Sequence, residues 1–325
     1  MMEQIREGFA RASAGGVDEI RIEVAGRPVT IRCGDRDTLD LLTRPYRHLR
    51  VDRDHVPDLI VNAWSGGRSP TPPPNRGGDR RLLKSTSATV FVDSVEGLMA
   101  AYGESEAWYW TRGKALVPLW ESAAPMRPIW KWWLDSIGHV LIHAAGVAVE
   151  NRGVLFVGRS GSGKSTLALA CFHAGMRFAG DDYIAVDPLG PTVWSIFASA
   201  KLASPDLLRG LDLAGAGEGT PGRLATKYVA FLGESAPSRL ATDFRPVAIV
   251  LPSYDPSSVN SVRATVTPAE VMRAMAVPSL LQLPGPHGDA MARMATLASR
   301  LPAFRLQSGS DLAKSVAVIE ELLKS

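Results

Sequence analysis

The sequence predicts an α/β protein in which a layered domain of strands and helices follows a smaller, β-rich α+β domain. Two observations support this prediction. From residue 140 onward, stretches with strand and helix patterns interleave, which is typical of a sheet covered by helices. Residues 19–33 alternate apolar and polar side chains around a turn at residues 25–28, as a hairpin with one buried face does.

The first domain is expected to span residues 1–124 and to be built mainly of strands. Residues 65–80 are rich in proline and glycine and are expected to form a long loop. Six of the eight tryptophans lie between Trp108 and Trp133, and they form either an aromatic binding surface or a packed seam beside the following domain. Short helices or strands are expected at residues 1–14, 19–33, 38–43, 59–64 and 89–92.

The second domain is expected to span residues 125–325. Thr267 begins a Thr-Pro-Ala-Glu sequence that predicts the start of a helix, because Glu270 completes a capping box and proline takes the first helical position. Residues 210–224 are rich in glycine and predict a loop. Helices are expected at residues 129–142, 164–174, 289–300 and 311–323, and strands at residues 154–157, 176–180, 183–186, 191–197, 247–251 and 303–306.

The composition argues against several classes of protein. A net charge of +3 on 325 residues is too small to indicate nucleic acid or an anionic membrane as a partner. Cys33 and Cys171 lie far apart, so neither a disulfide framework nor a metal cluster is indicated. The N-terminus is charged, and no apolar run approaches the ~20 residues of a membrane-spanning helix. We therefore expect a soluble, cytoplasmic protein.

The most informative stretch is Gly158 to Ser165, which matches the phosphate-loop motif G-x-x-x-x-G-K-[ST] at every fixed position. An apolar run precedes it, and a helix pattern follows it. Glycines let successive backbone N–H groups converge on phosphate oxygens, and the helix N-terminus adds a partial positive charge. Lys164 is expected to reach the β- and γ-phosphates of a nucleoside triphosphate, and the Ser165 hydroxyl to ligate Mg²⁺.

A phosphate loop only holds a nucleotide, so other groups must orient the metal and activate a nucleophile. Asp181 and Asp182 follow the next expected strand, where active-site loops of α/β sheets gather. One carboxylate is a candidate Mg²⁺ ligand and the other a candidate general base, whereas a solvated turn is the alternative interpretation.

Two further residues have competing interpretations. Asp255 follows the apolar strand at residues 247–251 and is a second candidate for the acidic position, although Pro252 and the intervening residues are unusual there. His143 precedes the strand that leads into the phosphate loop, and a lone histidine in such a place is more often structural.

Taken together, His143-x-x-Gly146, the Gly158 to Ser165 loop and Gly180-Asp181-Asp182 resemble the catalytic core of the HPr kinase/phosphorylase family. The likeness is strongest to the HPr-kinase-related serine kinases, some of which accompany lasso-peptide biosynthesis and phosphorylate a precursor peptide on serine. It covers roughly residues 125–325, and the preceding residues do not resemble the N-terminal domain of the true HPr enzyme. The resemblance implies a phosphate-loop (P-loop) domain of HPr-kinase type.

The resemblance also implies a role for each matching position. The Asp181-Asp182 pair would supply the general base and help to hold the metal, with Asp181 as the metal ligand beside Ser165. His143 would lie near the phosphates and assist the base, and Lys164 would act in catalysis as well as in binding. The phosphates of ATP and its Mg²⁺ would be bound by Gly158, Arg159, Ser160, Gly161, Ser162, Gly163, Lys164, Ser165 and Thr166.

The chain departs from the family downstream of the acidic pair. The true enzyme has a Glu- and Arg-containing signature there, whereas this chain has the stretch from Ser195 to Leu202. The resemblance therefore leaves open whether phosphorolysis accompanies the kinase reaction. Lys201 is a candidate cation for stabilising charge on a transferred phosphoryl group.

These observations favour an ATP- and Mg²⁺-dependent kinase that phosphorylates a serine hydroxyl on a peptide or small protein, lasso-precursor-like or HPr-like. A nucleotide-regulated peptide-binding protein without transfer activity and a kinase for a small metabolite stay open as alternatives. No nucleic-acid or membrane partner is expected, and the chain is a candidate homo-oligomer. The sequence does not identify the phosphoacceptor.

Overall fold

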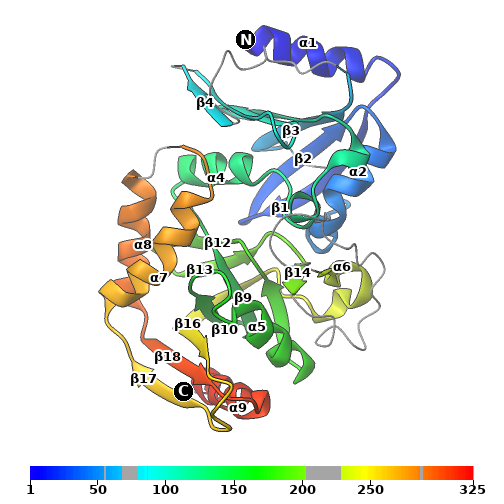
Figure 1. The fold of residues 1–325 in the computed structure, drawn as a ribbon. Coiled ribbons are helices and arrows are strands. Elements are labelled where there is room, and N and C mark those ends of the chain that lie inside the picture. Colours follow the sequence, from blue (N-terminus) through cyan, green and yellow to red (C-terminus); the bar gives the residue numbers. More distant parts are fainter. Residues whose placement is uncertain (55, 68–79, 86, 203–227, 286–287, 325) are drawn as a thin grey trace. The chain divides into compact units, whose positions relative to one another are not determined.

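The computed structural model describes residues 1–54, 56–67, 80–85, 87–202, 228–285 and 288–324. The chain is a mixed α/β protein with several sheets, and it divides into two compact units, Met1–Trp133 and Leu134–Ser325 (Figure 1). The expected loop at residues 210–224 and most of the expected loop at residues 65–80 lie outside the described residues.

The first unit contains a seven-stranded sheet with the strand order β1-β2-β3-β7-β6-β5-β4. β1 and β2 form the expected antiparallel hairpin, and β3 runs parallel to both β2 and β7. The elements are α1 (Met2–Ala12), β1 (Asp18–Val24), β2 (Arg27–Cys33), α2 (Arg36–Thr43), η1 (Arg44–Leu49), β3 (Leu59–Ser65), β4 (Arg80–Lys84), β5 (Thr89–Asp93), β6 (Leu98–Gly103), β7 (Glu106–Thr111), η2 (Lys114–Leu116), α3 (Leu119–Ala123) and α4 (Arg127–Ser136), which contains the division between the units.

The helix α1 packs against one face of this sheet. Ile5 is fully buried in a cluster that includes Trp64, Trp108 and Trp110, and Phe9 contacts the Trp64 ring at 6.0 Å between ring centroids. Trp108 and Trp110 therefore belong to a core within the first unit and not to an exposed aromatic surface.

The second unit contains the glycine-rich loop singled out in the sequence. Its elements are β8 (Val140–Ile142), β9 (Ala144–Val149), β10 (Arg152–Val157), α5 (Lys164–His173), β11 (Arg177–Gly180), β12 (Ile184–Asp187), β13 (Thr192–Ser195), β14 (Ser199–Leu202), β15 (Tyr228–Phe231), α6 (Leu232–Ser235), η4 (Pro237–Arg239), β16 (Asp243–Tyr254), β17 (Val262–Thr265), α7 (Pro268–Leu281), α8 (Gly288–Arg300), β18 (Ala303–Ser308) and α9 (Leu312–Lys324).

A nine-stranded sheet forms the centre of this unit. β10, β16 and β18 are parallel neighbours, whereas β9 pairs antiparallel with both β10 and β11. Because the carboxyl ends of parallel strands share one edge, the segments that follow β10, β16 and β18 meet there. A separate two-stranded pair, β14 and β15, lies outside this sheet.

Helices cover both faces of the sheet. Along β10, Val154 and Phe156 lie in a core with α5 and α9, whereas Leu155 and Val157 lie in a second core with α7 and α8. Figure 1 shows α7 and α8 on one side of the strands and α5 on the other. Burial on both faces explains why this strand is a continuous apolar run and does not alternate.

The main difference from the sequence prediction is the helix expected at residues 129–142. The helix α4 ends at Ser136, and the strand β8 follows as an antiparallel partner of β12. Gly138, with φ +89°, adopts the left-handed conformation that ends helices, which is the local reason for the change. The strands β4, β6, β7, β9, β14, β15 and β17 were not predicted. Among the described residues, no helix combines the length and apolar character needed to cross a membrane.

Candidate functional site

The loop at residues 158–163 connects β10 to α5, so the strand, loop and helix occur in the expected order. Gly163 precedes the helix with φ +98°, a left-handed conformation that favours glycine. A Cβ atom at Gly158 would lie 2.7 Å from the Ser162 Oγ, which is closer than such atoms approach in proteins. Glycines at these two positions therefore allow the loop to fold tightly.

Lys164 begins α5, and its side chain folds back over the loop. The residue is 6% exposed, and its Nζ donates to the carbonyl oxygens of Gly158 at 2.8 Å and Arg159 at 3.2 Å. Within the described residues, no side chain caps the N-terminus of α5. The N–H groups of the first helical turn are thus free of a side-chain cap, and they carry the positive end of the helix dipole.

Ser165 and Asp181 form a contact between the first turn of α5 and the end of β11. The Ser165 Oγ donates to Asp181 Oδ1 at 2.9 Å, and the backbone N–H of Lys201 donates to Asp181 Oδ2 at 3.2 Å. Asp181 is 2% exposed. Burial, together with the neighbouring Asp182 carboxylate, raises the pKa of Asp181 to about 6. A cation placed beside this carboxyl would therefore favour its charged form.

The backbone at Asp182 turns sharply after β11. Asp182 has φ +72°, and the N–H of Tyr183 donates to the carbonyl oxygen of Asp181 at 3.0 Å, which closes a three-residue turn. Because of this turn, the two adjacent carboxylates engage different partners. Asp182 forms an ion pair with Lys201 of β14, and both side chains are largely buried. Strained turns of this kind concentrate at functional sites.

His143 lies between β8 and β9 and is 5% exposed. Its ring contacts Tyr183 edge-to-face, with 5.4 Å between ring centroids. Its backbone N–H donates to the Ser279 hydroxyl of α7 at 2.8 Å. The histidine is thus held from two elements beside the turn that carries Asp182.

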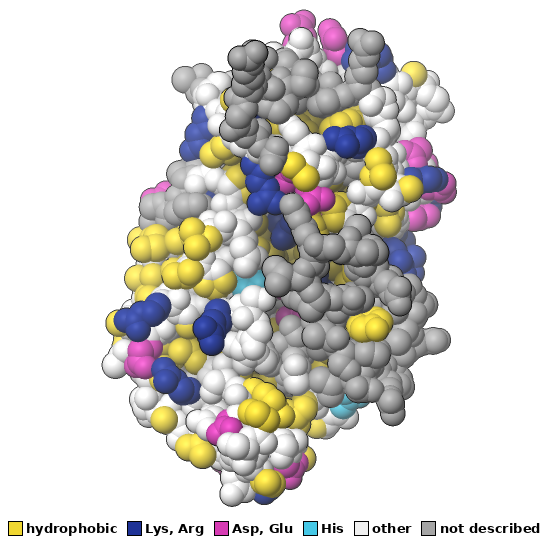
Figure 2. Space-filling view, viewed as in Figure 1, with side chains coloured by type: hydrophobic (Ala, Val, Ile, Leu, Met, Phe, Trp, Pro, Cys, Tyr) yellow, Lys and Arg dark blue, Asp and Glu magenta, His cyan; other side chains and the backbone are white. Residues whose placement is uncertain are grey.

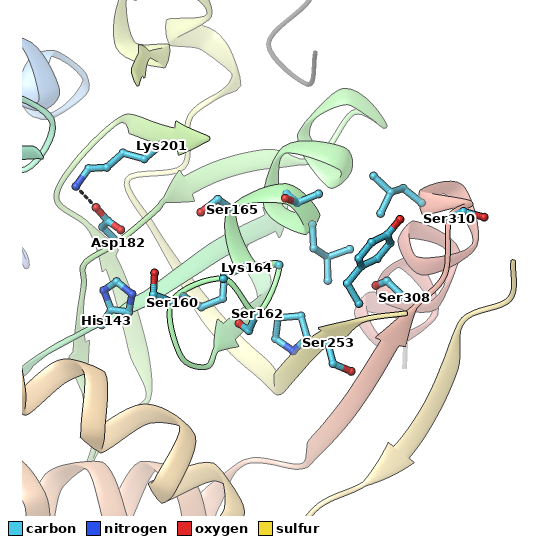
Figure 3. A pocket seen from close by; sticks show the side chains of 17 residues that line it. His143, Ser160, Ser162, Lys164, Ser165, Asp182, Lys201, Ser253, Ser308 and Ser310 are labelled. Carbon is cyan, nitrogen blue, oxygen red and sulfur yellow. Dashed lines mark ion pairs between the residues drawn. The ribbon is translucent and has the colours of Figure 1, made fainter. Parts of the chain in front are cut away.

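A cavity of about 420 Å³ joins these groups, which is within the usual size range of small-molecule sites. Figure 3 shows Lys201, Asp182 and His143 on one side of the loop residues, and Ser253, Ser308 and Ser310 on the other. The cavity is lined by His143, Ser160, Gly161, Ser162, Gly163, Lys164, Ser165, Thr166, Leu167, Asp182, Lys201, Pro252, Ser253, Tyr254, Ser308, Ser310 and Leu312.

The residues present fit a phosphate group with a hard divalent cation. The Ser162 Oγ is buried without a hydrogen-bond partner among the described residues, and it lies in a loop whose lysine is already turned inward. The Ser165 hydroxyl and the Asp181 carboxyl offer oxygen atoms, which Mg²⁺ prefers. Among the described residues there is no cluster of three or more His, Cys, Asp or Glu side chains suited to a metal.

Most residues singled out in the sequence line this one cavity. Gly158 and Arg159 lie in the loop but line a neighbouring cavity. Asp181 does not line the cavity itself and instead contacts the hydroxyl of Ser165, which does. Asp255, the competing acidic residue, is engaged in a turn after β16, where it accepts from the Ser257 N–H and hydroxyl and from Gln307.

The sequence reasoning missed the far end of the cavity. Tyr254, Ser308, Ser310 and Leu312 were not proposed as site residues, although they line it. Their position in the chain could have identified them, because Tyr254 ends β16 and Ser308 ends β18, two strands that run parallel to β10. Segments after the carboxyl ends of parallel strands are where ligands of α/β sheets bind.

No protein-family model matches the sequence, and no curated protein matches it. Among solved structures, the chain is similar to the Hpr(Ser) kinase/phosphatase from Coxiella burnetii, with 14% sequence identity and a TM-score of 0.28. The match covers 57% of this chain and 93% of that one.

Proposed function

We propose that this chain transfers the γ-phosphoryl group of ATP, with Mg²⁺, to a serine hydroxyl of a peptide or small protein. The observation that most supports the proposal is that Asp181 and Asp182, adjacent in one turn, contact different groups. Asp181 contacts the Ser165 hydroxyl at the start of α5, whereas Asp182 faces the cavity and pairs with Lys201. Asp181 is thus suited to bind a metal cation, and Asp182 is suited to accept a proton as a general base.

The cavity suits a nucleotide along its length. The loop N–H groups, the first turn of α5 and Lys164 would bind the phosphates. The Tyr254 ring and Leu312 offer apolar surface for a base, and the hydroxyls of Ser308 and Ser310 offer hydrogen bonds to a ribose or base edge. Ser165 and Asp181 would hold Mg²⁺, which when bound neutralises charge on the β- and γ-phosphates.

The transfer step assigns a role to each remaining side chain. Asp182 accepts the proton of the incoming serine hydroxyl while the serine oxygen forms a bond to the γ-phosphorus. The bond between the γ-phosphorus and the bridging oxygen breaks, and ADP leaves. Lys201 positions Asp182 and stabilises charge on the transferred group, and His143 assists the base from the same cavity.

The nature of the acceptor follows from the sequence motifs more than from the cavity. The resemblance of the His143, Gly158 to Ser165 and Asp181-Asp182 pattern to the HPr-kinase-related serine kinases implies an acceptor that is lasso-precursor-like or HPr-like. Phosphate transfer separates this proposal from a nucleotide-regulated binding protein, which would bind ATP without a phosphorylated product. The mass of the product separates it from a small-metabolite kinase.

The test measures transfer and binding separately. The full chain is incubated with γ-labelled ATP, Mg²⁺ and serine-containing peptides, and products are identified by intact-mass spectrometry. Asp182→Asn is expected to lower transfer about 10²- to 10⁴-fold, since general-base catalysis contributes that much, while ATP binding persists. Lys164→Ala is expected to lose ATP binding, and Asp255→Asn serves as a control that keeps both. Transfer by Asp182→Asn at the wild-type rate would remove Asp182 from the mechanism.

A further inference from the structure

A second cavity, of about 610 Å³, borders the same phosphate loop. It is bounded by the loop, the end of β16, the helix α7 and one residue of β18. Gly161, Ser162 and the Pro252 to Tyr254 stretch line both cavities, so the loop and the strand end form a shared wall. A molecule in the second cavity therefore lies directly beside the proposed nucleotide site.

The charges around this second cavity are unbalanced. Arg159, Arg273 and Arg305 line it, and among the residues that the structure describes the one carboxylate in its lining is that of Glu270. Glu270 is already engaged, because it accepts from Arg305 at 2.9 Å and from Thr267 at the start of α7. Within the described residues, the guanidinium of Arg273 has no hydrogen bond or ion pair. Among the described lining residues, three guanidinium groups thus face one carboxylate, and this excess of positive charge favours an acidic ligand.

One face of α7 places exposed apolar side chains next to the arginines of the cavity. Arg273, Val277 and Leu281 follow one another at four-residue spacing, so they share a helix face. Val277 is 52% exposed and Leu281 is 82% exposed, although α7 packs its other side into the core. In Figure 2, hydrophobic and basic side chains lie side by side over the region of α7. A small anion would leave this apolar surface uncovered, whereas a peptide with acidic and apolar residues would cover both parts.

We propose that this cavity docks an acidic, apolar-containing segment of the phosphoacceptor and so selects the peptide to be phosphorylated. The proposal rests on the proposed function, because it places the acceptor beside the site of transfer. Carboxylates of the segment pair with Arg273 and Arg159, whereas Arg305 stays paired with Glu270. The apolar residues of the segment cover Val277 in the cavity and Leu281, one turn further along α7. A bidentate Arg–carboxylate contact has a fixed geometry in addition to its charge attraction. It would therefore orient the bound segment relative to the phosphate loop.

The test uses positional-scanning peptide libraries that contain one serine and are labelled with fluorescein. Retention on the immobilised full chain measures docking without ATP, and labelled ATP measures transfer. The wild type is expected to select Asp or Glu together with apolar residues. Arg273→Glu is expected to weaken retention of acidic peptides about fivefold, which is about 1 kcal/mol, and to favour Lys or Arg at one position. The matched control is Arg245→Glu, the same change at the other end of β16, about 30 Å from Tyr254.

The outcomes separate this proposal from the proposed function. Acidic peptides that are retained through Arg273 but never phosphorylated support docking and contradict the kinase reaction. Peptides phosphorylated equally well by the wild type and by Arg273→Glu overturn docking and leave the reaction intact. Libraries retained without any preference, or not retained at all, also overturn docking. A dimer of the free chain that Arg273→Glu dissociates, or retention of a single-stranded oligonucleotide instead of peptides, would assign the cavity to another occupant.

Discussion

Replacement of Asp181 by asparagine is expected to stabilise the nucleotide-free protein at neutral and alkaline pH. The Asp181 carboxyl is buried, accepts from Ser165 and the Lys201 N–H, and lies beside a second carboxylate. An asparagine of the same shape keeps both contacts, because its oxygen accepts from the Lys201 N–H and its amide donates to the Ser165 hydroxyl. Only the buried negative charge is lost.

The magnitude follows from the raised pKa. A carboxyl with a pKa of 3.8 in the unfolded chain and about 6 in the folded chain costs the folded state about 3 kcal/mol when both states are ionised. Below pH 3.8 both states are protonated and the cost disappears. Between these values the folded state holds the proton more tightly, so stability falls as pH rises. The advantage of Asp181→Asn is therefore largest above pH 6, and at pH 5 it is about half as large.

The assay is urea unfolding of the full chain, followed by hydrogen exchange in peptides from β10 and α5 so that the second unit is measured directly. Wild type and Asp181→Asn are compared at pH 5 and pH 8, in EDTA and in Mg²⁺ with ATP. Mg²⁺ with ATP is expected to stabilise the wild type more than the variant, since the variant lacks the charged oxygen. The control is Asp255→Asn, because the Ser257 hydroxyl holds the pKa of Asp255 below its usual value and its replacement should destabilise at pH 8.

Two results would refute this reasoning. One is a variant that is less stable than the wild type at pH 8 in EDTA, because the carboxylate would then be stabilised by its surroundings. The other is an advantage that is equal at pH 5 and pH 8, because it could not come from a titrating group.

Two further predictions concern packing and helix capping. Gly153→Ala is expected to destabilise the second unit by about 1–3 kcal/mol in urea unfolding, since its Cβ would lie 2.2 Å from Phe244 Cδ2, and an unchanged midpoint would contradict the contact. Gly15→Ala, where a Cβ meets nothing within 4 Å, is the control. Thr267→Ala is expected to cost about 1 kcal/mol because it removes the capping box of α7, whereas Thr267→Ser should keep most of that stability; equal losses would argue against the cap.

Local signals in the sequence were sufficient for much of the second unit. The apolar run before Gly158, the helix from Lys164 and the glycine at position 175, with φ +106°, occur as expected. The capping box at Thr267 is also present. Each of these features depends on neighbouring residues alone, so a sequence pattern carries the information.

The missed elements depend on distant partners. The strands β6 and β7 are almost entirely buried, so they lack the alternation that marks a half-buried strand. The strand β8 fits helical spacing when read with α4, and only its pairing with β12 identifies it. Likewise, the contact between Asp182 and Lys201 requires the turn after β11 and the separate pair of β14 with β15.

The double burial of β10 bears on ligand affinity. Val154 and Phe156 pack into the core on one face of the sheet, and Leu155 and Val157 pack into the core on the other face. The two hydrophobic cores therefore fix the position at which the chain enters the glycine loop. The conformational entropy of this segment is therefore lost when the protein folds, and its ordering does not reduce the free energy of ligand binding. A change in either core is thus a means of adjusting the loop from a distance, without touching any residue that lines the cavity.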